Sequence, residues 1–361
     1  MNSRERFNLA MRFKRVDRLP ILYTHGWPTT VLRWKQEGMT SEETLFPAFD
    51  GPMQSCWMYG ESQGPLPAFE ETVLEENDDH SIVRNYLGQK VCQKKNVTSM
   101  PHFLEYPIRS RKDWQNYRKR LDPYSPGRYP DNWETLVQER KTIRSGEIRG
   151  VACWGFYGFP REMIGPETLS LMFYDDPGLI LEMNEFWADF TIKRLERAVT
   201  EMAFDYALIW EDNCYNHGML HSPRIFREFM APGYRKLVDF FKGHDIDIIS
   251  VDSDGNVLEF IPLLLDVGVT GVHPFEVAAG MDVVKIGRQY PGLQIWGGLD
   301  KRALAKDKTA IDKELRRVIL PMKKRGGYAA SLDHGVPSDV SFENYLYYVK
   351  RLQEISIIDP C

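Results

Sequence analysis

Several features that mark large classes of protein are missing from this sequence. No stretch approaches the roughly 20 consecutive apolar residues that a membrane-spanning helix needs, and residues 1–7 lack the apolar core of a signal peptide. The five cysteines are scattered, odd in number and without Cys-x-x-Cys spacing. We therefore expect reduced thiols, no thiolate metal site, a cytoplasmic location and no membrane partner.

Excess positive charge and nucleotide-binding loops are missing too. The net charge of −5 gives no electrostatic reason to expect nucleic-acid binding. No Gly-x-Gly-x-x-Gly follows a predicted strand, and there is no P-loop. These absences argue against an open doubly wound sheet, which is the alternative to a barrel.

One stretch, residues 245–274, indicates how the chain is organised. A β-branched run at 246–251 predicts a strand buried on both faces. Residues 257–267 are apolar at helical spacing, and Gly268 fits the C-terminal cap of that helix. The next predicted strand, 269–272, ends at His273. In this βαβ unit Asp252 and Asp254 stand at the strand end, where parallel α/β folds bind ligands.

The same alternation of strand and helix recurs along the chain. Predicted strands at 21–23, 151–154, 206–210, 246–251, 269–272, 293–296 and 328–332 alternate with helices such as 160–173, 177–202 and 222–243. About eight such units close into a (β/α)8 TIM barrel. We therefore predict an α/β fold with one domain over 1–361, in which 150–355 form the main barrel and about 30–145 elaborate it.

An N-terminal extension of helices and a β-hairpin is also predicted. Residues 3–13 form an amphipathic pattern that Ser3 would cap. Two alternating runs, 81–86 and 89–96, are separated by Leu87-Gly88 and predict a hairpin outside the main sheet.

In a barrel, the residues that follow each strand converge on one mouth. Carboxylates that share a partly dry pocket repel each other and raise each other's pKa values. Shared protons, a bound cation or outward-turned side chains would relieve that repulsion. The predicted mouth is heavily acidic, with three histidines and one lysine; it includes His25, Trp154 to Tyr157, Glu211, Asp212, Asn213, Asp252, Ser253, Asp254, His273, Glu276, Asp300, Lys301, Asp333 and His334.

A divalent metal is the sharpest interpretation of this mouth. Asp252 and Asp254 are two residues apart, so extended spacing places them on the same side of the chain, and His334 would supply a nitrogen. This set suits zinc as a Lewis acid, although Mn²⁺ or Fe²⁺ could also be held. The alternative is that Asp254 caps the following helix and Asp252 pairs with Lys301 or Arg302, because Asp-x-Asp-Gly is common in turns.

Other residues of the mouth are candidates for contact with a substrate. Glu211 and Glu276 would orient ligands or act as a general acid. The predicted substrate-binding residues are His25, Trp27, Trp154, Tyr157 and Asp300.

Several separate segments together resemble the uroporphyrinogen decarboxylase superfamily. Segments 3–7 and 16–20 resemble its N-terminal opening, and 222–234 resembles its central helix. Gly-Gly-Leu-Asp at 297–300 and Asp-His-Gly-Val-Pro at 333–337 resemble two late strand ends. The resemblance implies a (β/α)8 barrel and also a homodimer.

The resemblance implies one of two chemistries. Uroporphyrinogen decarboxylase acts on a tetrapyrrole without a cofactor and has an arginine-rich loop after its first strand, whereas here no arginine follows until Arg33. Corrinoid-dependent methyltransferases bind zinc through a His-x-Cys pair and a later Cys, and those positions fall on Asp252, Asp254 and His334 here. The harder oxygen and nitrogen set suits polarising an ether or alcohol oxygen, as in methyltransferases that act on methoxylated aromatics.

We therefore expect a metal-dependent methyltransferase that moves a methyl group between a small substrate and cobalamin on a corrinoid-binding protein. Asp252, Asp254 and His334 would hold the metal, with zinc as the first choice, and Asp254 and His334 would be catalytic together with Glu211 and Glu276. A cofactor-free decarboxylase that uses Asp254 and His334 as acid and base is the alternative. A non-catalytic barrel that binds a corrinoid or tetrapyrrole is the second alternative.

Overall fold

A ring of parallel strands runs through most of the chain. The computed structural model describes residues 1–52, 56–57, 60–95, 100–142 and 146–358. Seven strands pair in the order β15-β14-β13-β12-β9-β8-β3. Their bounds are β3 Cys56–Trp57, β8 Gly150–Trp154, β9 Tyr206–Trp210, β12 Ile249–Asp252, β13 Gly271–His273, β14 Gln294–Trp296 and β15 Tyr328–Ala329.

The ring closes through its first two strand positions. β1 (Leu22–Tyr23) pairs in parallel with β2 (Gly51–Pro52), and a parallel bridge joins Ile21 to Ala330, next to β15. β3 pairs in parallel with β8, so β2 and β3 together take the second of eight places in the ring. The predicted (β/α)8 barrel is confirmed.

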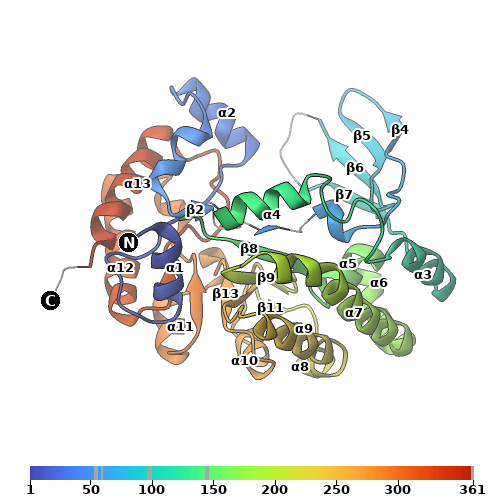
Figure 1. Cartoon of the computed structure of the whole chain (residues 1–361). Coiled ribbons are helices and arrows are strands. Elements are labelled where there is room, and N and C mark those ends of the chain that lie inside the picture. Colours follow the sequence, from blue (N-terminus) through green and yellow to red (C-terminus); the bar gives the residue numbers. More distant parts are fainter. Residues whose placement is uncertain (53–55, 58–59, 96–99, 143–145, 359–361) are drawn as a thin grey trace.

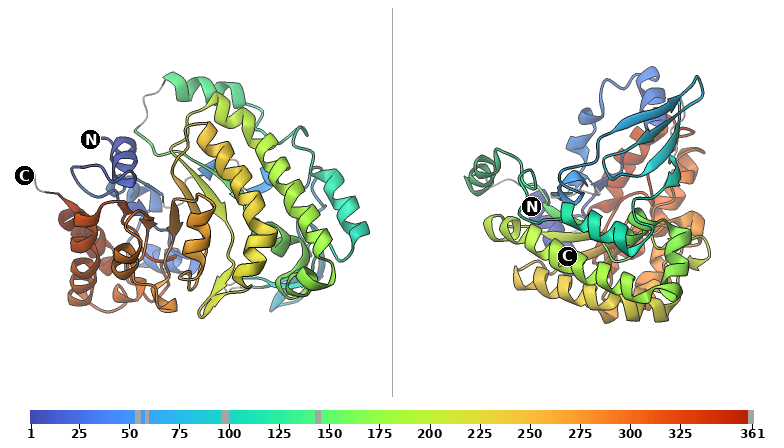
Figure 2. Two further views of the ribbon diagram at one scale, coloured as in Figure 1. Left: turned by 90° about the horizontal axis from the view of Figure 1, so that it is seen from below. Right: turned by 90° about the vertical axis from the view of Figure 1, so that its right-hand side faces the viewer.

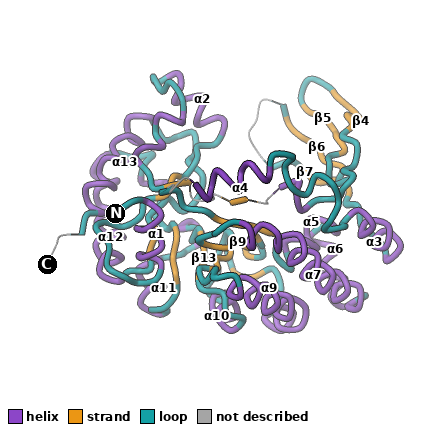
Figure 3. The backbone as a smooth tube through the Cα atoms, in the orientation of Figure 1, coloured by secondary structure: helices purple, strands orange, loops and turns teal. Residues whose placement is uncertain are grey.

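Helices form a layer outside the strands (Figure 3). In Figures 1 and 2, α11 to α13 lie on one side of the ring, and α7 and α9 lie on the other. Among the described residues, no helix combines the length and apolar character needed to cross a membrane. The outer helices are α2 Pro28–Gln36, α5 Gly158–Ile164, α6 Pro166–Asp175, α7 Pro177–Glu201, α8 Pro223–Ile225, α9 Ala231–Gly243, α10 Phe260–Asp266, α11 Val283–Gln289, α12 Lys308–Arg325 and α13 Phe342–Ser356.

One predicted helix is interrupted and another is continuous. The helix expected over 160–173 is divided into α5 and α6, because Gly165 adopts a φ of 90° and Pro166 starts the next helix. The helix expected over 222–243 runs without a break from α8 to α9, with a π-helical turn, Phe226–Met230, between them. The first prediction was wrong in continuity, and the second is confirmed.

A four-stranded antiparallel sheet stands beside the barrel, at the right of Figure 1. Its strands are β4 Thr72–Glu76, β5 His80–Arg84, β6 Lys90–Lys94 and β7 His102–Glu105. The predicted hairpin is its central pair, β5 and β6; residue 96, expected in the second strand, lies outside the described residues. Two further helices, α3 Arg111–Tyr117 and α4 Trp133–Thr142, complete this part of the chain.

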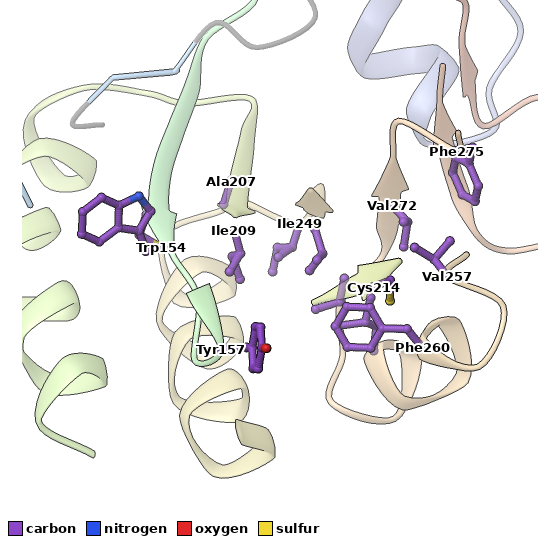
Figure 4. Packing of buried hydrophobic residues seen from close by; sticks show 14 of the residues in the cluster. Trp154, Tyr157, Ala207, Ile209, Cys214, Ile249, Val257, Phe260, Val272 and Phe275 are labelled. Carbon is purple, nitrogen blue, oxygen red and sulfur yellow. The ribbon is translucent and has the colours of Figure 1, made fainter. Parts of the chain in front are cut away.

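Side chains alternate between the inside and the outside of the ring. In β9, Leu208 belongs to a small inner cluster, whereas its neighbour Ile209 belongs to the large outer core. Ile249 of β12 and Val272 of β13 join Ile209 in the outer core, where Phe260 of α10 also packs (Figure 4). This alternation decides which residues at a strand end point into the ring.

The first helix, α1 (Ser3–Met11), closes the floor of the ring. Phe7 packs into the inner cluster, with its ring 5.7 Å from that of Tyr206 and 5.5 Å from that of Trp296. The helix begins at Ser3 and ends at Met11, two residues before the expected end, and Asn2, not Ser3, caps it by accepting a hydrogen bond from the Glu5 backbone N–H. Asn2 is an equally good cap, so the sequence pattern alone did not separate the two.

Candidate functional site

A cavity of about 1370 Å³ includes the carboxyl ends of several barrel strands and reaches into the ring as far as Ile148 and Leu208. This volume exceeds the roughly 300–1,000 Å³ of most small-ligand pockets. Its described lining carries six carboxylates and two arginines. One of the six, Asp50, is buried and paired with Arg6 and Arg18. The other five still outnumber the arginines, so the cavity favours cations and disfavours polyanions. The charged lining residues are Asp50, Glu147, Asp212, Asp252, Asp254, Glu276, Arg149 and Arg161, together with His25 and His334.

Three carboxylates from two strand ends meet in this cavity. Asp212 follows β9, while Asp252 ends β12 and Asp254 follows it. One ligand oxygen of each lies within 4.8 Å of those of the other two. Among the described residues, this is the set of acidic, histidine or cysteine side chains that comes close enough to share one cation.

The alternation along the strands explains this convergence. Leu208 points into the ring, so Trp210 and Asp212 continue on the same side, and both line the cavity. Asp212 has a φ of 46°, in the left-handed region that an aspartate tolerates better than most residues. Asp254 is held next to it, because its backbone N–H donates a hydrogen bond of 3.3 Å to Asp212 Oδ1.

His334 joins this group through Asp254. Its Nε2 lies 3.3 Å from Asp254 Oδ2. Burial by itself would raise the pKa of Asp254, but the hydrogen bond and charge of His334 outweigh burial and lower it. The hydrogen bond to Asp254 in turn raises the pKa of His334, so the two side chains form an ion pair.

Asp212 is the carboxylate that this environment destabilises most clearly. Burial, and then the charges of Asp254 and Asp252, raise the pKa of Asp212 to about 6. Arg161 of α5 is its one partly compensating cation among the described residues: the guanidinium lies 3.5 Å from Asp212 Oδ2 and 5.0 Å from the ring centre of Trp210. A carboxylate in this state gains from any cation that enters the cavity.

Asp252 is contacted by a fully buried histidine. His273, at the end of β13, lies with Nε2 3.5 Å from Asp252 Oδ1. Its Nδ1 lies 3.2 Å from Ser250 Oγ, and its ring stacks on Trp296 at 5.2 Å. Nε2 is buried and has no hydrogen-bond partner in the structure.

Aromatic rings form the wall next to the acidic group. Trp27 stacks on His334, with ring centres 5.8 Å apart and planes at 23°. Phe46 and Phe49 pack edge-on against Tyr23, with ring centres 5.1 Å and 5.2 Å from it. All of these rings line the cavity.

His25 lines the cavity too. Burial, followed by the charge of His334, lowers the pKa of His25.

The structure does not bring all of the predicted site residues to the cavity. His25, Trp27, Asp252, Asp254, Glu276 and His334 line it, whereas Glu211, Trp154, Tyr157 and Asp300 are not among the described lining residues. Trp154 packs on Trp187 with ring centres 6.0 Å apart. Tyr157 is buried against His221, and Asp300 caps the turn Lys301–Ala303 and pairs with Arg302.

Glu211 is a fully buried carboxylate that holds the turn after β8 in place through hydrogen bonds. It accepts hydrogen bonds of 2.7 to 2.8 Å from the backbone N–H groups of Phe156, Tyr157 and Gly158. The hydroxyl of Tyr234 donates a further one of 2.5 Å. Burial raises the pKa of Glu211, although these hydrogen bonds oppose the rise. Its oxygens are thus already engaged by the protein.

Glu276 lies at the rim of the cavity, next to the half-buried Lys301. Lys301 Nζ lies 3.7 Å from Glu276 Oε1 and 3.9 Å from Asp333 Oδ1. Asp333 also accepts hydrogen bonds from the backbone N–H groups of Val277 and Lys301. This network ties the loops after β13, β14 and β15 together and holds Glu276 at the cavity.

Two residues of the site were not selected from the sequence. Asp212 was among the predicted strand-end residues, but its neighbour Glu211 was selected as the catalytic residue. The alternation of side-chain direction along β9, counted from the inward-pointing Leu208, would have favoured Asp212. Arg161 comes from the middle of a helix, and no sequence pattern indicates that it reaches Asp212 and Trp210.

Comparison with known proteins agrees with this architecture. The chain matches the family described as uroporphyrinogen decarboxylase (URO-D) over residues 79–355. A uroporphyrinogen decarboxylase from Hydrogenobaculum sp. (strain Y04AAS1) is 30% identical over 69 residues, which are 19% of this chain and 20% of that protein. The chain thus matches about a fifth of the length of this curated relative. A methyltransferase from Methanosarcina mazei superposes with a TM-score of 0.59 and 13% identity over 98% of both chains, a likeness of fold.

Proposed function

The chain belongs to the uroporphyrinogen decarboxylase family, and from that premise we propose that it is a metal-dependent methyltransferase. It would move a methyl group between a small substrate, such as a methoxylated aromatic compound, and cobalamin carried by a corrinoid-binding partner protein. The observation that carries this proposal is the group of carboxylates beside His334 and an aromatic wall. The Methanosarcina methyltransferase supports it through the shared fold alone.

The residues at the strand ends fit a divalent cation. Asp252 and Asp254 would be ligands. His334, the nitrogen donor that the sequence predicts for zinc, lies 3.3 Å from Asp254 but outside the group of three close carboxylates, so its side chain would have to turn toward the ion. A cation would relieve the repulsion that raises the pKa of Asp212. When bound, the metal would supply a Lewis acid for the oxygen that carries the methyl group.

The protein's own side chains would orient the substrate. An aromatic ring would pack against the wall of Tyr23, Phe46 and Phe49 and direct its ether oxygen to the carboxylates. Trp27 would keep the His334 ring in place by stacking on it. These rings would also exclude water from one side of the reacting group.

A proton for the leaving oxygen would come from the same group of residues. His334 Nε2 faces Asp254 Oδ2 at 3.3 Å, and as a metal ligand this nitrogen would carry no proton. Glu276 lines the cavity from the loop after β13, and Lys301 keeps it in place. Glu276 would therefore stand next to a phenolic oxygen bound at the carboxylates and would act as the general acid.

The second candidate function is decarboxylation without a cofactor. The contact between Asp254 and His334 favours it, because such a pair can act as acid and base. Six carboxylates against two arginines in the described lining disfavour it, because uroporphyrinogen carries many negative charges.

A reconstituted assay separates the two functions. The purified protein is mixed with free cob(I)alamin, in place of the partner, and a methoxyphenol, and visible absorbance follows the formation of methylcobalamin. We expect turnover that a chelator abolishes and that Asp254→Asn lowers by at least about 100-fold. Release of CO₂ from uroporphyrinogen is measured in parallel.

A matched substitution controls for the loss of one charge. Asp189→Asn removes an exposed carboxylate of α7 that pairs with Lys236, and it should leave turnover unchanged. Decarboxylation of uroporphyrinogen by the parent protein, with no methyl transfer from any methoxyphenol, would reject the methyltransferase in favour of the second candidate.

A further inference from the structure

Asp212 stands outside the metal set that the sequence predicts, but the structure places it in the acidic group together with Asp252 and Asp254. We infer that Asp212 is a third carboxylate ligand and that the site is built for a hard divalent ion of the Mg²⁺ or Mn²⁺ class. This inference rests on the metal site of the proposed function and not on methyl transfer.

The distances between the carboxylates fit one shared ion. Two oxygens on opposite sides of an ion are about 4.2 Å apart for Mg²⁺ and about 4.8 Å apart for Ca²⁺. The ligand oxygens of Asp212, Asp252 and Asp254 all lie within 4.8 Å of one another. The three oxygens are therefore close enough to one another to surround a single divalent ion.

His273 is an independent observation that points to a ligand at this place. Its side chain is fully buried, and its Nε2 has no hydrogen-bond partner among the described residues, although it lies 3.5 Å from Asp252 Oδ1. Carboxylates that hold metals are usually supported from behind by a further donor of this kind. Ser250, at 3.2 Å from Nδ1, fixes the other side of the ring.

The backbone around Asp212 is held firmly enough to serve as one wall of a metal site. Its two neighbours are buried and hydrogen-bonded: Glu211 accepts four hydrogen bonds, and the Asn213 oxygen accepts from Cys214 Sγ and Ser253 Oγ. Between them Asp212 is kept at a φ of 46°. Ligands fixed in this way lose little freedom when an ion binds.

The donor chemistry selects the class of ion. Three carboxylates with one imidazole next to them are mostly oxygen, and oxygen donors suit Mg²⁺, Mn²⁺ and Ca²⁺. Arg161, 3.5 Å from Asp212 Oδ2, limits the net negative charge when no cation is bound. A zinc site made of thiolates and imidazoles would show no comparable affinity for Mg²⁺.

Manganese titration tests the inference directly. Chelator-treated full-length protein is titrated with Mn²⁺ at pH 7.5, and the electron paramagnetic resonance signal of free Mn²⁺ is followed. We expect one tight site per chain, displacement of Mn²⁺ by millimolar Mg²⁺, and an affinity about 10-fold or more lower in Asp212→Asn. Asp212→Glu, which keeps the carboxylate, should retain part of the affinity, and Asp189→Asn should retain all of it.

Several results would overturn the inference. Equal Mn²⁺ affinity in Asp212→Asn and the parent protein would remove Asp212 from the ligand set, and failure of Mg²⁺ to compete would remove the hard-ion site. If Asp212→Asn does not fold, Asp212→Ser is titrated instead, with urea unfolding as the check. Binding of Mn²⁺ that depends on Asp212, without methyl transfer by the parent, would keep this inference and reject the proposed function.

Discussion

At the scale of single residues, His221 shows how a side chain outside the cavity supports the acidic loops. It is buried, and its Nε2 lies 3.2 Å from the amide nitrogen of Asn213, the residue after Asp212. Its Nδ1 lies 3.3 Å from the Ser222 carbonyl oxygen. Both contacts suit a neutral imidazole, which accepts from Asn213 and donates to Ser222.

This environment predicts a loss of stability in acid. Burial lowers the pKa of His221 from 6.5 to about 4, so the unfolded chain binds the proton more readily than the folded protein does. The contribution of His221 is complete above pH 6.5 and falls as the pH drops toward 4. When the pH is lowered from 7 to 5, the free energy of unfolding should fall by about 2 kcal/mol more in the parent protein than in His221→Gln.

Urea unfolding at the two pH values measures this difference. His102→Gln, which removes an exposed histidine of β7, is the matched control and should behave as the parent protein does. An acid-induced loss of the same size in His221→Gln and the parent would mean that another group is responsible.

At the scale of elements, the loop between β12 and α10 places Asp254. Gly255 follows it with a φ of 80°, and a Cβ atom there would lie 2.8 Å from the backbone of Tyr215. The backbone N–H of Asn256 donates to the Tyr215 carbonyl oxygen at 2.8 Å. The short β10–β11 ribbon, Cys214–Tyr215 and Gly218–Met219, therefore fixes the loop that carries Asp254.

Gly255→Ala should damage both the loop and the site. The left-handed φ costs about 1 kcal/mol for a non-glycine residue, and the close contact with Tyr215 adds to it. We expect a loss of about 2–3 kcal/mol in the free energy of unfolding and weaker Mn²⁺ binding, measured by urea unfolding and by the manganese titration. Gly280→Ala is the control: its φ is 85°, but no atom lies within 4 Å of the added Cβ. Equal losses in both variants would contradict the role of the Tyr215 contact.

The elements that the sequence predicted well are those with long, regular patterns. The helix expected over 177–202 is α7, Pro177–Glu201, and the strand expected over 206–210 is β9. β2 and β3 were missed, because these two-residue strands lie in a stretch rich in proline, glycine and acidic residues, which indicates loops. Asp252 and Asp254 could be placed at the mouth from their strand, whereas the separation of Asp212 from Glu211 needed the direction of each side chain.

At the scale of the whole molecule, α1 joins the beginning of the chain to strands from both halves of the ring. Arg4 pairs with Asp205 before β9, Arg12 pairs with Asp247 before β12, and the Gln294 side chain donates to the Met11 carbonyl oxygen. Phe7 fills the space between these contacts and is 1% exposed. The helix therefore contributes to barrel stability far from the cavity.

Phe7→Ala should lower the stability of the whole barrel. Removal of a buried phenylalanine costs about 3–5 kcal/mol, since it leaves a cavity among packed side chains. Phe46→Ala, at a position that is 48% exposed, should cost less than about 1 kcal/mol. Urea unfolding measures both variants, and similar midpoints would show that α1 is not part of the cooperative core.

A ring floored by its own first helix is not a tunnel. Whatever the carboxylates hold cannot pass out through the base of the barrel, where Phe7 packs on Tyr206 and Trp296. Under the proposed function, a small methyl donor and a bulky acceptor protein would then have to enter by the same rim, which predicts that the donor binds first and the acceptor protein second, before the methyl group moves directly between them.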